Sequence, residues 1–396
     1  MHIPSAFAAT ARWGTRLLLL GLAGCVDAYM PDVIDAPNKY LVVDGFINGN
    51  GATRIKLSRT ENIATPTAPP VERGATVFIV DNVGTRYATR EVSPGLYKSD
   101  SMVLNPARQY QLRIATAGAS AASYESDLVP LKVSPPIDKV DWVQQGGELQ
   151  LRVSTHDAQS QSRYYRWSFT ETWEFHSAYE SQLEYINGIV TTRTTPIYTC
   201  WRTEQNTSIK QGSTAQLSQD ALTNLLLFSI SDRAERLKIR YSVLVNQNTE
   251  TAEEFAYYEL LRKNTEAVGT VNDPLPTQLT GNVHRVGTAT NEPVLGFVGA
   301  HTVQQTRIFL TPQILNLPAG WSFEDPYAAC TIGQELAPDP RDKYPIYIPY
   351  TRIFSDPSNV PIDYLTGPGG YTGYMGSSRA CVDCRTRGVN MKPSFW

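Results

Sequence analysis

Residues 164–175 read YYRWSFTETWEF, and this stretch predicts the fold class of the chain. Large apolar side chains occupy alternate positions from Tyr165 to Phe175, and polar or charged residues fill most positions between them. Side chains of a β-strand alternate between its two faces, so the stretch predicts one long strand with an aromatic face. Glu171 falls on that face. This predicts either a bulge that turns it outward or a buried carboxylate with a partner.

Shorter strand signals lie on both sides of this stretch, at residues 40–43, 55–57, 75–80, 110–114 and 237–245. Short alternating runs separated by turn signals are typical of β-sandwiches. We therefore predict a mainly β protein, with an N-terminal Ig-like β-sandwich domain followed by a larger β-rich domain that has one or two short helices.

Three further segments qualify this prediction. Thr251-Ala252-Glu253-Glu254 forms a capping box and predicts a helix of about 12–15 residues. Residues 217–228 are ambiguous between helix and strand. Residues 335–375 are rich in Pro, Gly, Asp and Tyr, which predicts an ordered loop.

The N-terminus has the features of a lipoprotein signal peptide. Arg12 and Arg16 precede a short leucine-rich core, and Leu22-Ala23-Gly24-Cys25 follows it. The core is shorter than the roughly 20 apolar residues of a membrane-spanning helix. We expect cleavage before Cys25 and lipidation of its thiol, since several acyl chains anchor a protein durably. An ordinary signal peptide with a chance cysteine is the alternative.

The domain boundaries follow from these signals. Pro135 and Pro136 interrupt the strand rhythm and predict a linker. We expect a signal peptide at residues 1–24, a lipidated tether at 25–37, a sandwich at 38–135 and a C-terminal domain at 139–396. No other apolar run of about 18 residues occurs in the sequence.

Four cysteines follow Cys25, namely Cys200, Cys330, Cys381 and Cys384. An even number in an exported chain predicts two disulfides, for which three pairings exist. We favour a pairing in which Cys200 and Cys330 each reach one member of the Cys381/Cys384 pair, which would staple the tail to the domain. Redox catalysis and a four-cysteine zinc site are the weaker alternatives, because the sequence context of a thioredoxin motif and a second close pair are both missing.

Catalytic motifs are absent from the sequence. None of His2, His156, His176, His284 and His301 belongs to a zinc-protease motif, and neither a nucleophile elbow nor a phosphate-binding loop occurs. Asp339, Asp342, Asp356 and Asp363 lack the ligand spacing of a calcium loop. The net charge of −3, without a basic run, argues against nucleic acid as a partner. We therefore predict no enzymatic activity, no metal and no cofactor.

Tyrosine is abundant, with 21 residues, and several tyrosines fall near the C-terminus where we expect loops. Tyrosines in loops offer rigid, amphipathic contact area to a partner or ligand. Core packing is the alternative role. The candidate binding aromatics are Tyr344, Tyr347, Tyr350, Tyr364, Tyr371 and Tyr374.

Motifs spread over the chain resemble the domain of unknown function family 4249 (DUF4249), lipoproteins found mainly in Bacteroidota. The most specific motifs are Cys381-Val382-Asp383-Cys384-Arg385 and Lys392-Pro393-Ser394-Phe395-Trp396. The other motifs are Cys25-Val26-Asp27, residues 41–45, 57–60, 164–167, 171–173 and 240–242, Gln247, and residues 272–276 and 294–297.

The resemblance implies a location more than an activity. Members of the family are outer-membrane lipoproteins that are often encoded beside TonB-dependent transporters. We therefore expect a non-enzymatic accessory or ligand-binding lipoprotein of the outer membrane, with its periplasmic or surface face left open. The alternatives are a structural envelope protein and a surface glycan or peptide hydrolase that uses Glu171 and Glu174. These two carboxylates are three residues apart on one predicted strand and should point to opposite faces.

Overall fold

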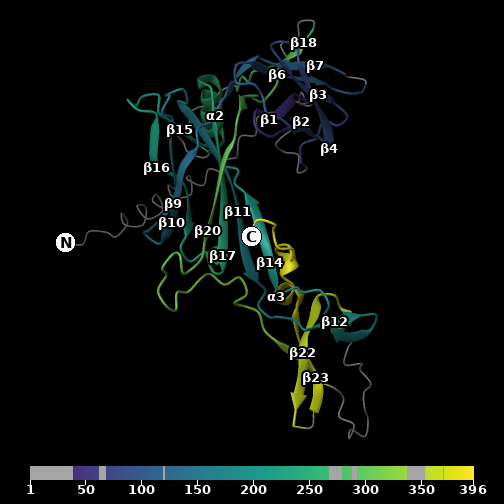
Figure 1. Cartoon of the computed structure of the whole chain (residues 1–396). Coiled ribbons are helices and arrows are strands. Elements are labelled where there is room, and N and C mark those ends of the chain that lie inside the picture. Colours follow the sequence, from purple (N-terminus) through teal and green to yellow (C-terminus); the bar gives the residue numbers. More distant parts are fainter. Residues whose placement is uncertain are drawn as a thin grey trace, which may run out of the picture.

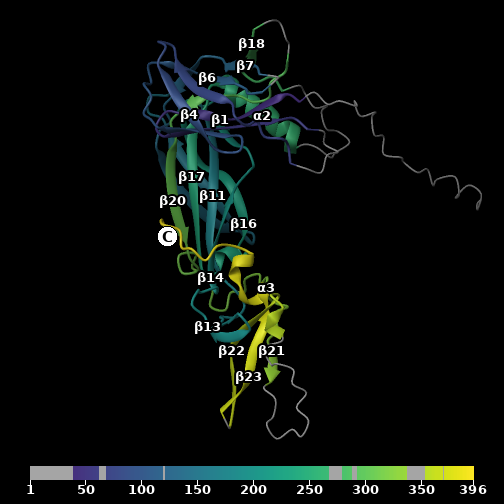
Figure 2. The ribbon, with the colours of Figure 1, turned by 90° about the vertical axis from the view of Figure 1, so that its right-hand side faces the viewer.

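The computed structural model describes residues 39–61, 68–118, 121–266, 279–287, 292–336, 353–368 and 370–396. The fold is mainly β with few short helices, as predicted. Three parts follow one another along an elongated molecule (Figures 1 and 2). We call them the first unit, the central sandwich and the distal arm.

The first unit is a single sheet of ten strands, in the order β18-β7-β6-β3-β4-β5-β2-β1-β19-β8. An additional pairing of β8 with β6 closes this sheet on itself. Its strands are β1 (Leu41–Asn48), β2 (Ala52–Arg59), β3 (Thr76–Asp81), β4 (Arg86–Ser93), β5 (Leu96–Ser101), β6 (Gln109–Ala115), β7 (Ser123–Ser126), β8 (Val129–Lys132), β18 (Val283–Val286) and β19 (Ala300–His301).

Two strands of the first unit come from late in the chain. β19 pairs in parallel with β1 and β8, and β18 pairs with β7. The side chains of Val294 and Val298 also join the core of this unit, beside Leu41 and Ile55. The chain therefore returns to the first unit after it has built most of the central sandwich.

The central sandwich packs two sheets around one core. One sheet has the order β16-β10-β9, and the other has the order β14-β11-β17-β20 with β15 paired to β11. The strands are β9 (Ile137–Gln145), β10 (Glu148–His156), β11 (Tyr164–His176), β14 (Thr199–Gln205), β15 (Lys210–Ser213), β16 (Ala221–Ser231), β17 (Arg240–Thr249) and β20 (Gln304–Leu310). The ambiguous segment at 217–228 thus contributes a strand. The turn η1 (Glu235–Leu237) precedes β17.

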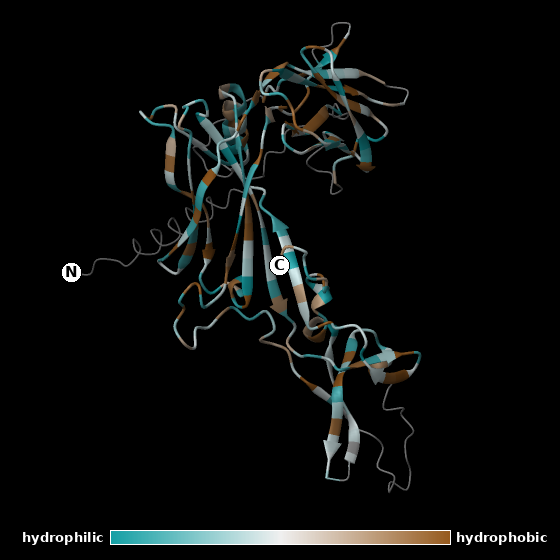
Figure 3. Ribbon diagram, viewed as in Figure 1, coloured by the Kyte–Doolittle hydropathy of each residue, from teal (hydrophilic) through white to brown (hydrophobic). Residues whose placement is uncertain are grey.

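Strand β11 is the predicted aromatic strand. Trp167, Phe169 and Trp173 are buried on one face and form the core with Leu151 of β10 and Val245 of β17. Figure 3 shows the resulting alternation of apolar and polar segments along the strands. Each large apolar side chain removed from water contributes about 1.5–3 kcal/mol. The burial of this face therefore contributes to the stability of the central sandwich.

Glu171 remains on the aromatic face and is buried. Its Oε1 accepts hydrogen bonds from Arg236 Nη1 and from the hydroxyl of Tyr241, each at 2.7 Å. The strand continues through this position in regular register with β17. The second of the two predicted alternatives, a buried carboxylate with partners, is therefore the one observed.

The distal arm consists of two small sheets. One is the hairpin of β12 (Leu183–Ile186) and β13 (Ile189–Thr192), and the other has the order β21-β23-β22. Its strands are β21 (Gly333–Leu336), β22 (Asn359–Gly367) and β23 (Gly370–Ser378), and the turn η2 (Ile353–Ser355) precedes β22. The prediction of an ordered loop at 335–375 was therefore wrong for these strands. Backbone pairing between β22 and β23 tolerates their many glycines, which carry no side-chain signal.

Helix α2 (Ala252–Glu266) begins at the predicted capping box and lies between the first unit and the central sandwich (Figure 1). It brings Glu254 to a buried cluster of charges. Arg166 of β11 contacts Glu250 through Nε, and its Nη2 donates to Glu254 Oε1 at 3.2 Å. The Tyr258 ring covers the guanidinium, and buried His301 of β19 lies 3.8 Å from Glu254. This Arg166 cluster joins β11, α2 and β19, and so connects the two units.

The Arg166 cluster should make stability depend on pH. Burial, and then the charge of Glu250, raise the pKa of Glu254 to about 8, although Arg166 opposes the shift. Burial also raises the pKa of Glu250, while it lowers the pKa of His301 well below its ordinary value and leaves that imidazole neutral. The ordinary pKa of a glutamate is about 4.3. At pH values between about 4.3 and about 8, the folded state therefore holds more protons on these glutamates than the unfolded state does.

We expect the free energy of unfolding to fall as pH rises from about 5 to 8, by at most about 1.4 kcal/mol per pH unit for each proton released. Glu254→Gln removes this titration and should flatten the profile. Glu253→Gln, an exposed neighbour on the same helix, is the matched control and should keep the wild-type slope. Urea unfolding at several pH values measures the slope of the free energy of unfolding against pH. Equal slopes in wild type and Glu254→Gln would contradict the assignment.

Candidate functional site

The last residues of the chain return from the distal arm to the central sandwich. After β23 the chain forms α3 (Arg379–Val382) and η3 (Cys384–Thr386), and then Val389 bridges to Trp201 of β14. Trp396 Nε1 donates to Glu174 Oε2 at 3.0 Å. The guanidinium of Arg307 lies 3.6 Å from the centre of the Phe395 ring. The tail is therefore held against the central sandwich up to its final residue.

Two disulfides attach the beginning of the tail to the rest of the molecule. Cys200 of β14 pairs with Cys384, and Cys330 pairs with Cys381. Cys200 and Cys384 are fully buried in the core of the central sandwich. Each isolated cysteine thus reaches one member of the close pair, which is the arrangement that the sequence analysis favoured. The bonds cross-link the arm, the tail and the central sandwich where the three meet.

The tyrosines proposed as binding aromatics have different environments. Tyr364 of β22 is exposed and Tyr374 of β23 is buried, with their ring centres 5.8 Å apart. Tyr374 also packs edge-on against Phe354, so it is a core residue of the arm. The backbone of Tyr371 lies in β23. The side chain of Tyr371, and the whole of Tyr344, Tyr347 and Tyr350, lie outside the described residues.

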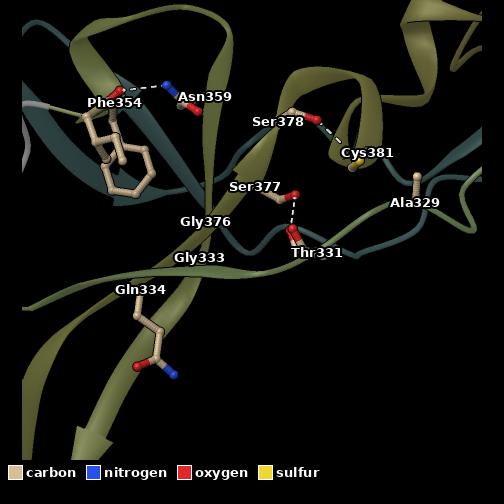
Figure 4. Close-up of a pocket in the computed structure, with 11 residues that line it drawn as sticks. Ala329, Thr331, Gly333, Gln334, Phe354, Asn359, Gly376, Ser377, Ser378 and Cys381 are labelled. Atoms are coloured by element: carbon tan, nitrogen blue, oxygen red, sulfur yellow. Dashed lines mark hydrogen bonds between the residues drawn. The ribbon is translucent and has the colours of Figure 1, made fainter.

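A cavity of about 280 Å³ opens beside β23 (Figure 4). Gly333 of β21 and Gly376 of β23 are paired neighbours in its lining, which also includes Phe354. A Cβ added at Gly376 would lie 2.6 Å from the Phe354 ring, so the close approach requires glycine. Ser377 Oγ donates to the carbonyl of Thr331 at 2.6 Å. The described lining is uncharged, which suits a neutral ligand bound by hydrogen bonds.

The arm also exposes apolar side chains. Ile186 and Ile189 lie on the β12–β13 hairpin, and Ile332, Ile353 and Tyr364 lie on or beside the three-stranded sheet. Exposed apolar side chains mark a protein-binding surface where they form a contiguous patch. We call this set the arm surface. No local sequence signal indicates this surface, because its residues are spread from position 186 to position 364 of the chain.

A second cavity, of about 450 Å³, lies where the central sandwich meets the arm. Three carboxylates line it, those of Glu174, Glu235 and Asp325. Glu235 accepts from Arg387 Nη1 at 2.8 Å and from Nη2, and Glu174 accepts from Trp396. Asp325 accepts from the backbone N–H of Tyr327 at 2.9 Å.

These contacts bear on the hydrolase alternative. A glycosidase uses two carboxyl groups about 5–10 Å apart, one as the acid and the other as the base or nucleophile. Glu171 lies in the core on the opposite face of β11 from Glu174, so these two residues do not form such a pair. The rings of His176 and Tyr198, whose centres lie 4.5 Å apart and which are tilted by 31°, also line this cavity.

The remaining sequence candidates have these outcomes. Cys25, Asp339 and Asp342 lie outside the described residues, as does the 272–276 motif. Asp356 accepts hydrogen bonds from Ser358, and Asp363 accepts one from the Tyr364 N–H. Within the described ranges, no group of three or more His, Cys, Asp or Glu is placed to hold a metal ion. None of the helices in the described part of the chain has the length and apolarity needed to cross a bilayer.

Comparison with known proteins places the chain in a family. The model of the domain of unknown function DUF4249 matches residues 26–307, so the chain belongs to the DUF4249 family. A search of curated proteins found no significant match. Among solved structures, that of the Yersinia pseudotuberculosis adhesin InvE is similar at 14% identity and a TM-score of 0.16. That alignment covers 52% of this chain and 55% of the adhesin chain, about half of each.

Proposed function

We propose that this chain is a non-enzymatic outer-membrane lipoprotein of Bacteroidota, anchored through lipid at Cys25, and an accessory or ligand-binding component of a TonB-dependent uptake system. One observation carries the proposal: the point where the chain enters the described structure and the distal arm lie at opposite ends of the molecule. The chain enters the described structure at Lys39, next to β1 in the first unit, while the distal arm lies at the opposite end (Figures 1 and 2).

The segment between Cys25 and Lys39 is short enough to keep the first unit near the membrane. The 14 steps along the chain from Cys25 to Lys39 span at most about 50 Å when fully extended. A lipid anchor at Cys25 would confine the protein to the membrane surface and raise its effective concentration for a membrane partner. The first unit would then lie nearest the anchor, and the arm could reach a partner in the same membrane or its substrate.

The arm has the physical properties of a contact surface. Exposed isoleucines and Tyr364 supply apolar area, and the two disulfides hold the arm and tail together. A rigid surface loses less conformational entropy on binding, and apolar or aromatic residues at the centre of an interface carry most of its affinity. We therefore assign partner binding to the arm surface.

Affinity purification tests the proposal. The tagged native protein, solubilised in detergent from outer membranes, should bring down a TonB-dependent transporter. Ile186→Asp/Ile189→Asp should reduce the recovered transporter about tenfold or more, because burying two new charges costs well over the 1.4 kcal/mol that a tenfold change represents. Val83→Asp/Val103→Asp is the matched control, since Val83 of the first unit is 64% exposed and Ile189 is 66% exposed. The control should bind like wild type.

Two outcomes would contradict the proposal. Recovery of the wild-type protein without any transporter would contradict the uptake role. An equal fall in the amount of recovered transporter with both double variants would contradict the assignment of partner binding to the arm surface.

The lipid anchor has its own test. Cys25→Ser should release the protein from the membrane fraction, and mass spectrometry of the native N-terminus should find lipid on Cys25. An intact, unlipidated Met1 would remove the basis for the assigned compartment.

A further inference from the structure

Three arginines line a third cavity, of about 280 Å³, at the base of the arm. Arg193 follows β13, while Arg379 and Arg385 lie on either side of the Cys381–Cys384 pair. Tyr185, Phe354 and Pro361 provide less polar walls. No local sequence pattern points to these arginines, because Arg193 is almost 200 residues away from the other two.

Two of the arginines share one carboxylate. Arg385 donates from Nε to Asp383 Oδ1 and from Nη2 to Asp383 Oδ2, both at 2.8 Å, and Arg379 Nη1 donates to the same Oδ2 at 3.0 Å. The Asp383 side chain is buried, and its backbone lies between two disulfide-bonded cysteines. Within the described residues, Arg379 Nη2 and Arg385 Nη1 donate no hydrogen bond.

Arg193 is the most buried of the three, with 10% of its side chain exposed. Its Nε donates to Ser181 Oγ at 2.9 Å, and its Nη2 donates to the carbonyl of Leu183 at 2.6 Å. Its ion pair with Glu184 is long, at 3.9 Å from Nη1. Burial lowers the pKa of Arg193, and the charges of Arg385 and Arg379 add to this effect against those of Glu184 and Asp383.

The charges of the cavity do not cancel. Three guanidinium groups face two carboxylates, those of Glu184 and Asp383, so the described residues leave one positive charge uncompensated. The nearby Asp356 is not part of the described lining and accepts hydrogen bonds from Ser358 instead. A partly buried positive charge favours an anion, and the planar guanidinium matches an oxyanion with two parallel hydrogen bonds.

We infer that this cavity is an oxyanion-binding site, built to hold a carboxylate or phosphate group of a ligand between Arg193, Arg379 and Arg385. The disulfides fix the backbone on which Arg379 and Arg385 stand, so the donors are already in place before the ligand arrives. The less polar walls hold the part of the ligand next to its charged group. This site goes beyond the proposed uptake role and does not depend on it.

Calorimetric titration tests the inference on the purified full-length protein, without any transporter. Inorganic phosphate and glutarate are titrated separately at pH 7, with chloride keeping the ionic strength constant. We expect saturable binding with a Kd on the order of 1 mM for at least one of them. Binding of phosphate alone assigns a phosphate ligand, binding of glutarate alone assigns a carboxylate ligand, and competition between them assigns a general oxyanion site.

Variants of the cavity arginines test whether the anion binds in this cavity. Arg379→Gln and Arg385→Gln should each weaken it about tenfold, because each removes a charge-assisted donor. Arg202→Gln is the matched control and should leave binding unchanged. Arg202 and Arg385 are both 41% exposed, and each pairs with an acidic residue two positions away. If a Gln variant does not fold, Arg385→Lys keeps the charge but loses the planar fork, and should weaken binding severalfold.

Two results would overturn the site. One is the absence of saturable binding for both anions with the folded wild-type protein. The other is binding that survives unchanged in the folded Arg379 and Arg385 variants, since the anion would then be bound elsewhere. Because the titration contains no membrane partner, failure of the uptake role would leave its result unaffected.

Discussion

Replacing Arg166 with glutamine is expected to lower the free energy of unfolding by about 3–5 kcal/mol at pH 7. The guanidinium is the only cation that contacts the fully buried carboxylates of Glu250 and Glu254 among the described residues. Without it, Glu250 must either stay charged in a medium of low polarity or take up a proton, as Glu254 with its pKa of about 8 already does at this pH. Each of these carries a large free-energy penalty. Urea unfolding, followed by tryptophan fluorescence, measures the change.

Two comparisons test the cause. Arg90→Gln removes an arginine from an exposed ion pair with Asp100 and should change stability by at most about 1 kcal/mol. Arg166→Gln/Glu250→Gln should recover part of the loss, because one buried carboxylate is then neutral. Equal losses in Arg166→Gln and Arg90→Gln would show that the Arg166 cluster contributes no more than a surface pair.

Removing the Cys200–Cys384 disulfide is the second large change. Cys200→Ala/Cys384→Ala should lower the free energy of unfolding by about 3–5 kcal/mol, because the bond restricts an unfolded chain over a separation of 184 residues. Cys330→Ala/Cys381→Ala opens a separation of only 51 residues and should cost about 1 kcal/mol less. Guanidinium unfolding under non-reducing conditions measures both variants.

Reduction provides the control for the disulfide variants. Dithiothreitol should destabilise the wild-type protein by more than it destabilises either double variant, since each variant has only one bond left to lose. Mass spectrometry of the non-reduced wild-type protein should find no free thiol among the four cysteines. Two free thiols, or no stability difference between reduced and oxidised protein, would contradict the role given to the disulfides.

Local patterns were reliable where a single segment contains its own signal. The alternation around Trp167 and Trp173 predicted a long strand, and Thr251 with Glu254 marked the start of α2. Both signals depend on neighbouring residues only. Strands β21, β22 and β23 were not predicted, because their glycines and polar residues form a sheet through pairing between segments and without an apolar stripe.

The candidate site was predicted only in part. The cysteine count suggested a stapled tail, but the pairing partners lie 184 and 51 residues apart, and the sequence allowed three pairings. The aromatic residues indicated a binding region, yet Tyr374 proved to be part of the arm's core. The arginine cavity had no signal, since spacing along the chain does not show that Arg193 meets Arg379.

The sequence by itself determined the class of secondary structure, the strand with the aromatic face and the expectation of disulfides, because side-chain periodicity and cysteine number are properties of the chain alone. Only the tertiary structure decided which cysteines pair, that β18 and β19 return to the first unit, and that three arginines surround one cavity. These features arise from contacts between distant segments, whose energies depend on the geometry of the folded chain.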